Sequence, residues 1–215
     1  MRRAGSDPGP FSITLTLMRT FSLLGAGLLL SFCCFAQTPA ADEPGLYATF
    51  DTSMGQIVVK LFDDKTPNTV KNFVALATGT KATLDKNNAM VKRHYYDGLT
   101  FHRVIKGFMI QTGDVKATGN TPCGIPDQKD EIDPSLNFKE PGILAVANTG
   151  RPNTGACQIF ITVGRPDYLT GTFTIFGKVV AGQDVADKIS QVPTVKDDKP
   201  LAPVTIKSVT IQKKP

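Results

Sequence analysis

FHRVIKGFMIQTGD, residues 101–114, places a single arginine among apolar and amide side chains, with no catalytic nucleophile nearby. Residues 99–105 are predicted to form a strand, in which Phe101, Arg103 and Ile105 share one face because successive side chains alternate. A guanidinium among apolar side chains is unfavourable unless its donors are used, so Arg103 needs either a carboxylate partner or a ligand. This segment alone leaves a structural ion pair and a functional site equally open. The lack of a nucleophile suits a reaction that breaks no covalent bond.

A second segment decides between these alternatives. Residues 142–161, GILAVANTGRPNTGACQIFI, pass from an apolar strand through a Gly/Asn/Pro loop into another apolar strand. Together with FHRVIKGFMIQTGD and TIFGKVV (174–180), this segment resembles the cyclophilins, and the resemblance extends more weakly over residues 47–211. The resemblance implies a mainly β fold, a closed eight-stranded antiparallel barrel capped by two helices, with peptidyl-prolyl cis/trans isomerase activity.

The implied chemistry acts on the X-Pro peptide bond. Resonance keeps this bond planar, and its isomers interconvert over a barrier of roughly 20 kcal/mol. As the bond twists, the proline nitrogen regains a lone pair, and a donor aimed at that nitrogen favours the twisted state over both planar states. The resemblance assigns this role to Arg103. It assigns Gln111 and Asn148 to holding the substrate backbone while the rest of the peptide rotates.

The proline ring needs an apolar socket. The resemblance places Phe108, Met109, Phe160 and Leu169 in this pocket, with Phe101 and Ala147 nearby, although ordinary core packing explains the last two equally well. Two further positions depart from the best-known eukaryotic pattern, because Tyr168 stands where tryptophan is usual and Phe173 where histidine is usual. Both changes keep an aromatic ring. Isomerase activity should survive them, but cyclosporin binding is expected to be weak without the tryptophan N–H donor.

The largest departure lies at residues 119–131, GNTPCGIPDQKDE, where the family carries a glycine-rich loop. The prolines should stiffen this loop and alter the preference for residues before the substrate proline. In the family fold, the corresponding loop faces the segment just before Gln158, which here holds Cys157. We therefore expect a Cys123–Cys157 disulfide if the protein reaches an oxidising compartment, with two separate buried thiols as the alternative.

The N-terminal residues have the pattern of an export signal. Met18-Arg19-Thr20 precedes an apolar run at 21–35, which predicts a signal peptide over residues 1–36 with cleavage before Gln37 and a possible true start at Met18. The run is too short to favour a membrane span. A lipoprotein anchored through Cys33 or Cys34 is the less favoured alternative, because Phe32 is bulky where a small residue is usual. We expect an exported protein, periplasmic or secreted.

The rest of the sequence predicts one domain at 46–213 after a short polar linker at 37–45. Strands are expected at 47–51 and 56–62, and a helix should begin with Thr66 as N-cap and Pro67 as first helical residue, and end at Gly79. The polar segment 81–94 is expected to be a surface loop. A second helix is predicted at 182–191, a loop at 192–203 and a closing strand at 204–211.

Composition and motifs exclude other classes. The formal net charge is +5, but the first 36 residues hold Arg2, Arg3, Arg19 and Asp7, which leaves 21 basic and 18 acidic residues and no argument for nucleic acid. The sequence has two histidines and neither HExxH, CxxC nor GxSxG, so no metal and no cofactor are expected. The glycines of 150–155 lack the Lys-Ser/Thr pair of a phosphate loop. His102, on the opposite face from Arg103, is expected to be a structural hydrogen-bonding histidine.

Two functions stay open on this basis. The first is a monomeric, exported prolyl isomerase that assists folding by acting on Pro-containing unfolded or partly folded polypeptides. The second is a non-catalytic cyclophilin-like module that binds Pro-containing segments. The presence of Arg103, Gln111 and Phe160 favours the enzyme.

Overall fold

The computed structural model describes residues 43–215. The predicted signal peptide lies outside these residues, as does most of the predicted linker, whose last residue, Gly45, already belongs to the first strand. The elements follow in this order: β1 (Gly45–Thr52), β2 (Gly55–Leu61), α1 (Pro67–Ala77), β3 (Ala82–Leu84), β4 (Met90–Lys92), β5 (Arg103–Ile105), β6 (Met109–Thr112), β7 (Ile143–Val146), β8 (Ile159–Thr162), η1 (Asp167–Leu169), β9 (Ile175–Ala181), α2 (Gln183–Ser190), η2 (Lys196–Asp198) and β10 (Ile206–Lys214).

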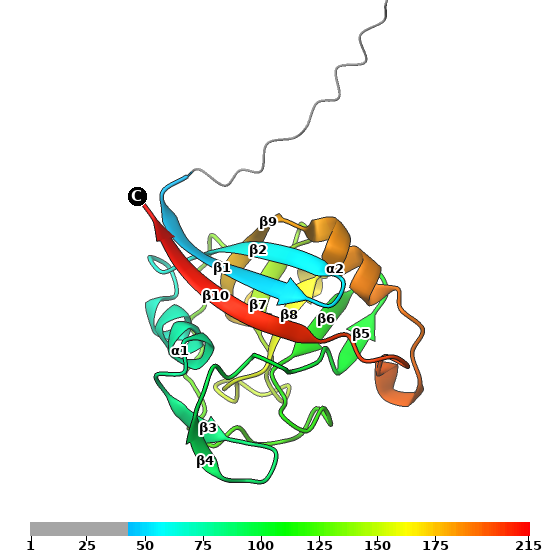
Figure 1. Ribbon diagram of the computed structural model, residues 1–215. Coiled ribbons are helices and arrows are strands. Elements are labelled where there is room, and N and C mark those ends of the chain that lie inside the picture. Colours follow the sequence, from blue (N-terminus) through cyan, green and yellow to red (C-terminus); the bar gives the residue numbers. More distant parts are fainter. Residues whose placement is uncertain (1–42) are drawn as a thin grey trace, which may run out of the picture. The chain divides into compact units, whose positions relative to one another are not determined.

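Eight strands form one curled antiparallel sheet in the order β10-β1-β2-β9-β7-β8-β6-β5 (Figure 1). β10 and β5 are its two end strands. The segment before β5 approaches β10, because Gly98 N–H donates to the Ile206 carbonyl and Phe101 N–H donates to the Val204 carbonyl. The predicted mainly β fold, with eight antiparallel strands and two helices, is confirmed. Closure of the barrel stays a prediction.

The strands of the sheet alternate between two apolar clusters. Ile110, Leu144 and Ile161, on β6, β7 and β8, belong to the main core, which also holds Phe50, Phe73 and Phe176. A second apolar cluster lies on the other face of these strands. It consists of their strand neighbours Met109, Ile143, Ala145 and Phe160, together with Phe138 and Ile175 from other segments. Period-two alternation thus gives β6, β7 and β8 an apolar side chain on each face.

Helix α1 begins at Pro67 as predicted, but its first turn is capped differently from the sequence expectation. Thr66 makes no capping hydrogen bond; its hydroxyl instead donates to the Phe62 carbonyl. The carboxylate of Glu131 takes that role by accepting hydrogen bonds from the backbone N–H groups of Asn68 and Thr69, at 3.2 and 2.7 Å. Thr66 is thus the N-cap residue as predicted, but a residue far along the chain supplies the side-chain acceptor in its place.

The segment 81–94 is not the irregular loop that we expected. β3 and β4 pair as an antiparallel hairpin, and Thr83 at its centre is buried. Leu84 N–H donates to the carbonyl of Cys123, at 2.8 Å, so the hairpin is attached to the 119–131 loop. Three-residue strands are too short to show a hydrophobic period, which is why the sequence did not reveal them.

The C-terminal elements agree more closely with the sequence. α2 covers Gln183–Ser190, and β10 pairs with β1 over its length. The expected loop at 192–203 contains the short helical turn η2, with a bridge between Thr194 and Pro200. Within residues 43–215, none of the helices has the length and apolar character needed to cross a membrane.

Candidate active site

Arg103 and Gln111 lie opposite each other on the paired strands β5 and β6. One Nη1 hydrogen of Arg103 points to the Gln111 Oε1, with the two heavy atoms 3.5 Å apart. On the other side of the guanidinium, Nε lies 3.5 Å from the Asp198 carboxylate, and both side chains are close to half exposed. Both alternatives for Arg103 are therefore combined: it has an acidic neighbour, and it remains accessible to a ligand.

Gln111 is held in turn by a second amide, that of Gln158. Gln111 Nε2 donates to Gln158 Oε1 at 2.9 Å, and Gln158 Nε2 donates to the Gly119 carbonyl at 2.9 Å. Sequence reasoning missed Gln158 as a site residue. It lies two positions before Phe160, so strand alternation could have placed it on the same face as the predicted pocket.

The predicted pocket residues gather in the second apolar cluster, on the outer face of β6, β7 and β8. Met109 and Phe160 are buried at its centre, and Phe108, Ala147, Leu169 and Phe173 pack around them. The Phe173 ring meets the Phe160 ring edge-on, with centroids 5.6 Å apart. The site therefore brings an apolar surface next to the Arg103–Gln111 pair.

Phe138 is a second residue that the sequence analysis missed. It is fully buried and stacks on Phe160, with ring centroids 6.0 Å apart. Its backbone N–H donates to the Thr170 hydroxyl, which anchors the surrounding irregular segment. Residues 132–142 form no strand or helix, so no periodic pattern could identify it.

Two aromatic residues of the predicted pocket lie at its limits. Phe101 belongs to the main core, because β5 starts only at Arg103 and alternation does not extend back to it. Tyr168 lies at the rim, 74% exposed, with its ring stacked on Phe108 at 6.4 Å. Phe101 thus packs in the interior, whereas Tyr168 is free to meet a ligand.

The Asn148 side chain shapes its own loop. Its Nδ2 donates to the Thr172 carbonyl at 3.3 Å, and its Oδ1 accepts from the Gly150 N–H at 2.9 Å. These contacts join the loop after β7 to the segment before β9. A role for Asn148 in holding substrate stays a prediction, and these two hydrogen bonds fix the position from which it would act.

His102 is buried, 5% exposed, and burial lowers its pKa. Neither ring nitrogen makes a hydrogen bond with the described residues. The expectation of a structural hydrogen-bonding histidine is therefore not met. The neutral ring instead packs beneath the 119–131 loop near Gly119.

Two clefts meet at Gln111. The first, about 490 Å³, runs from Gln111 and Gln158 to Ala147 and Asn148 and is bordered by the cysteine-containing loop. The second, about 600 Å³, runs past Arg103 toward Lys199. An extended chain could therefore cross the Arg103–Gln111 pair with its flanking residues in open space on both sides.

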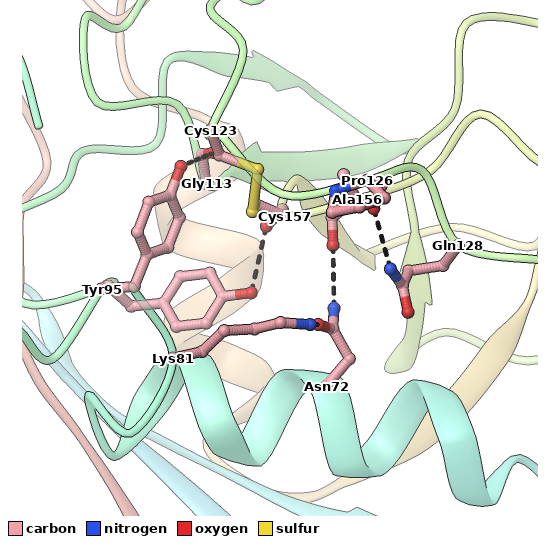
Figure 2. The surroundings of a disulfide bond; sticks show 10 residues. Asn72, Lys81, Tyr95, Gly113, Cys123, Pro126, Gln128, Ala156 and Cys157 are labelled. Atoms are coloured by element: carbon pink, nitrogen blue, oxygen red, sulfur yellow. Dashed lines mark hydrogen bonds between the residues drawn. A yellow bond between two sulfur atoms is a disulfide. The ribbon is translucent and has the colours of Figure 1, made fainter. Parts of the chain in front are cut away.

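Cys123 and Cys157 are joined by a disulfide, the pairing expected from the family resemblance (Figure 2). The hydroxyl of Tyr96 donates to the Cys157 carbonyl at 3.0 Å, and that of Tyr95 donates to the Gly113 carbonyl at 3.0 Å. Gly113 has a φ of 94°, and a Cβ there would lie 2.4 Å from the Cys157 carbonyl oxygen, so only glycine fits. The disulfide and these close contacts therefore hold Cys123 and Cys157, which line the first cleft, next to Gly113 at the end of β6.

Among residues 43–215, no three or more His, Cys, Asp and Glu residues are grouped so that they could hold a metal ion. The groups that the site presents are a guanidinium, three carboxamides and an apolar surface. This set can bind a peptide and polarise it, which matches the requirement of a conformational reaction.

Comparisons with known proteins identify the family. Residues 47–211 match the model of the cyclophilin type peptidyl-prolyl cis-trans isomerase family. Peptidyl-prolyl cis-trans isomerase A of Mycobacterium tuberculosis is 46% identical over 169 residues, covering 76% of this chain and 91% of that protein. Peptidyl-prolyl cis-trans isomerase B of Streptomyces anulatus is 44% identical over 173 residues, covering 78% and 97%.

A solved structure agrees with these relatives. The crystal structure of a cyclophilin type peptidyl-prolyl cis-trans isomerase from Cryptosporidium parvum has a TM-score of 0.67 and 32% identity, covering 79% of this chain and 98% of that one. The family model, the relatives and the fold agree over nearly all of the described domain. This chain belongs to the cyclophilin-type peptidyl-prolyl cis-trans isomerase family.

Proposed function

We propose that Arg103 is the group that lowers the isomerisation barrier in this enzyme, with the Met109–Phe160 cluster as the socket for the proline ring. The observation that carries the proposal is that a half-exposed guanidinium lies beside a buried apolar surface. The guanidinium is on β5, and Met109 and Phe160 of the apolar surface are on β6 and β8. A proline ring on that surface brings its nitrogen to the Arg103 side of the site.

The proposed step forms and breaks no covalent bond. In the planar states the proline nitrogen shares its lone pair with the carbonyl, and it accepts a hydrogen bond only when the bond is twisted. An N–H of Arg103 stabilises that twisted state, and the interaction is absent from both ground states. Gln111 orients the guanidinium and, with Asn148, holds the substrate backbone.

The proposal is tested by following cis to trans conversion of an X-Pro peptide in a protease-coupled assay. Arg103→Ala should remove most of kcat/KM, by about 100-fold if one preorganised donor is lost. Arg103→Lys keeps the charge but not the fork of donors, and should recover only part of the rate. Unfolding midpoints should match the wild type, since the side chain is half exposed. Wild-type turnover in Arg103→Ala would refute the proposed role.

We further propose that the enzyme is exported and assists the folding of Pro-containing polypeptides outside the cytoplasm. The apolar run at 21–35 supports export, and the Cys123–Cys157 disulfide suits an oxidising compartment. Mass spectrometry of protein produced in its native host should find an N-terminus near Gln37. An acylated Cys33 or Cys34 would indicate a membrane-anchored form, and an intact N-terminus in the cytoplasm would refute export.

We also propose that the protein acts as a monomer and binds cyclosporin weakly. The exposed Tyr168 at the pocket rim offers a phenol in place of the indole N–H donor that tryptophan would supply. Tyr168→Trp should therefore bind cyclosporin more tightly than the wild type in a titration. Light scattering at working concentrations tests the oligomeric state.

A further inference from the structure

The guanidinium of Arg103 is held from two directions by side chains of different segments. Gln111 on β6 contacts Nη1, and Asp198 in η2 contacts Nε, each at 3.5 Å. Among residues 43–215, Nη2 has no hydrogen-bond partner. The two contacts engage different nitrogens of the guanidinium and leave donors free for a ligand.

The turn that carries Asp198 has an unfavourable backbone. Asp197 and Asp198 are consecutive and both left-handed, with φ values of 64° and 58°. Left-handed conformations are uncommon for residues with a Cβ; glycine is the usual residue there, and asparagine and aspartate tolerate the region better than other side chains. Strained backbone that persists beside a functional site is a recognised sign of a functional requirement.

Contacts within the loop hold this turn in place. Val195 N–H donates to the Lys199 carbonyl and Leu201 N–H donates to the Pro193 carbonyl, both at 2.8 Å. These hydrogen bonds close a small hairpin whose tip presents Asp198 to β5. The hairpin thus delivers a carboxylate to Arg103 from a segment distant in sequence.

Stability alone does not explain this arrangement. The side chains of Arg103 and Asp198 are 43% and 47% exposed, and exposed ion pairs contribute little to folding because water screens them. The free energy gained from such an exposed ion pair offsets little of the cost of the left-handed turn that carries Asp198. Its effect on the orientation of a reacting group is a stronger reason for it to exist.

We infer that Asp198 is a positioning residue that orients the Arg103 guanidinium for the isomerase reaction. The inference rests on the proposed role of Arg103. Asp198 acts on the reaction through Arg103, and an unchanged KM in its variants would separate this role from substrate binding in the second cleft. With Nε engaged by Asp198 and Nη1 by Gln111, the guanidinium meets the twisting bond already oriented, so less conformational freedom is lost in the transition state.

Glycine substitutions in the η2 turn separate positioning from stability. Asp198→Gly removes the carboxylate and also relieves the left-handed strain, so the unfolding midpoint should stay the same or rise. Its kcat should nevertheless fall by about three- to fivefold, the upper end of what an exposed ion pair supplies, with little change in KM. Asp197→Gly is the matched control, since it removes one charge and one strained residue from the same turn without touching Arg103. It should retain wild-type turnover.

Further variants distinguish the possible failures. Asp198→Asn keeps an acceptor oxygen and should fall between Asp198→Gly and the wild type. In an Arg103→Ala background, Asp198→Gly should have no additional effect on residual turnover, because its target is gone. If Arg103→Ala abolishes turnover but Asp198→Gly and wild type are equal, the inference about Asp198 is wrong and the role of Arg103 stands. If Arg103→Ala itself is fully active, the proposed function of Arg103 fails instead. Equal losses in Asp198→Gly and Asp197→Gly would show a general charge effect and would also refute positioning.

Discussion

Removing the Cys123–Cys157 disulfide should destabilise the domain strongly while leaving it folded. The two cysteines are 34 residues apart in sequence. The loop-closure relation gives about 12.6 cal/mol/K for a loop of this length, or about 3.8 kcal/mol at room temperature. With a urea m-value of about 2 kcal/mol/M, the midpoint should move down by about 2 M.

The structure offers two ways of removing the bond that differ in packing. Reduction of the wild type keeps both sulfur atoms in place, whereas Cys123→Ala/Cys157→Ala deletes sulfur from two buried positions and adds a cavity effect. Urea unfolding with and without a reductant measures the first change, and the double variant measures the sum. The double variant should unfold at lower urea than the reduced wild type, and it should be insensitive to the reductant.

The reduced protein should retain its fold because other contacts hold the same two segments. Gln128 N–H, in the loop that holds Cys123, donates to the Gly155 carbonyl near Cys157 at 2.7 Å. The Asn72 side chain on α1 also donates to the Ala156 carbonyl at 3.1 Å (Figure 2). Near-native turnover at low urea is therefore expected after reduction. Equal urea midpoints for oxidised and reduced protein would refute the reasoning, since they would mean that loop closure contributes nothing.

Three further changes test other contacts. Glu131→Gln should lose about 1 kcal/mol at neutral pH, as for a lost helix cap. Burial would raise the pKa of Glu131, but hydrogen bonds from Thr69 and Asn68 outweigh it and lower the pKa below its usual 4.5. Its contribution is thus present above that value and lost as pH falls through the lowered pKa, so the variant and wild type should converge in acid-unfolding curves. Phe160→Ala should cost about 3 to 5 kcal/mol and raise KM, checked by unfolding and kinetics at low temperature. Gln158→Leu removes the acceptor of Gln111 Nε2 and should lower kcat/KM about two- to tenfold with no change in the disulfide.

Local patterns predicted the parts of the fold that depend on neighbouring residues. Alternation predicted β2, apolar runs predicted β7 and β8, and the Thr66-Pro67 pair located the start of α1. The same alternation correctly places Met109 and Gln111 on one face, because β6 is regular throughout. Where a strand stops, this reasoning fails, which is why Phe101 packs in the main core and Ile105 against the outer cluster.

Contacts between distant segments could not be predicted from the chain. Glu131 caps a helix that begins 64 residues earlier in the sequence, and Asp198 meets a guanidinium on β5. Gln158 and Gly119 also come together only through folding. None of these pairs has a local signature, since each depends on which loop passes over which strand. The family resemblance was needed to place the two cysteines near each other.

The hydrogen-bond chain from Gly119 through Gln158 and Gln111 to Arg103 joins the most divergent loop of the protein to its proposed catalytic group. The disulfide anchors one end of this chain, because Cys157 directly precedes Gln158 and Cys123 lies four residues after Gly119. Asp198 approaches the same guanidinium from the opposite side. On this inference, Arg103 is positioned by two loops, one closed by a disulfide and the other ending in a left-handed turn. A change in either loop can alter turnover without altering the socket for proline, and substrate preference and rate can therefore vary separately on the same sheet.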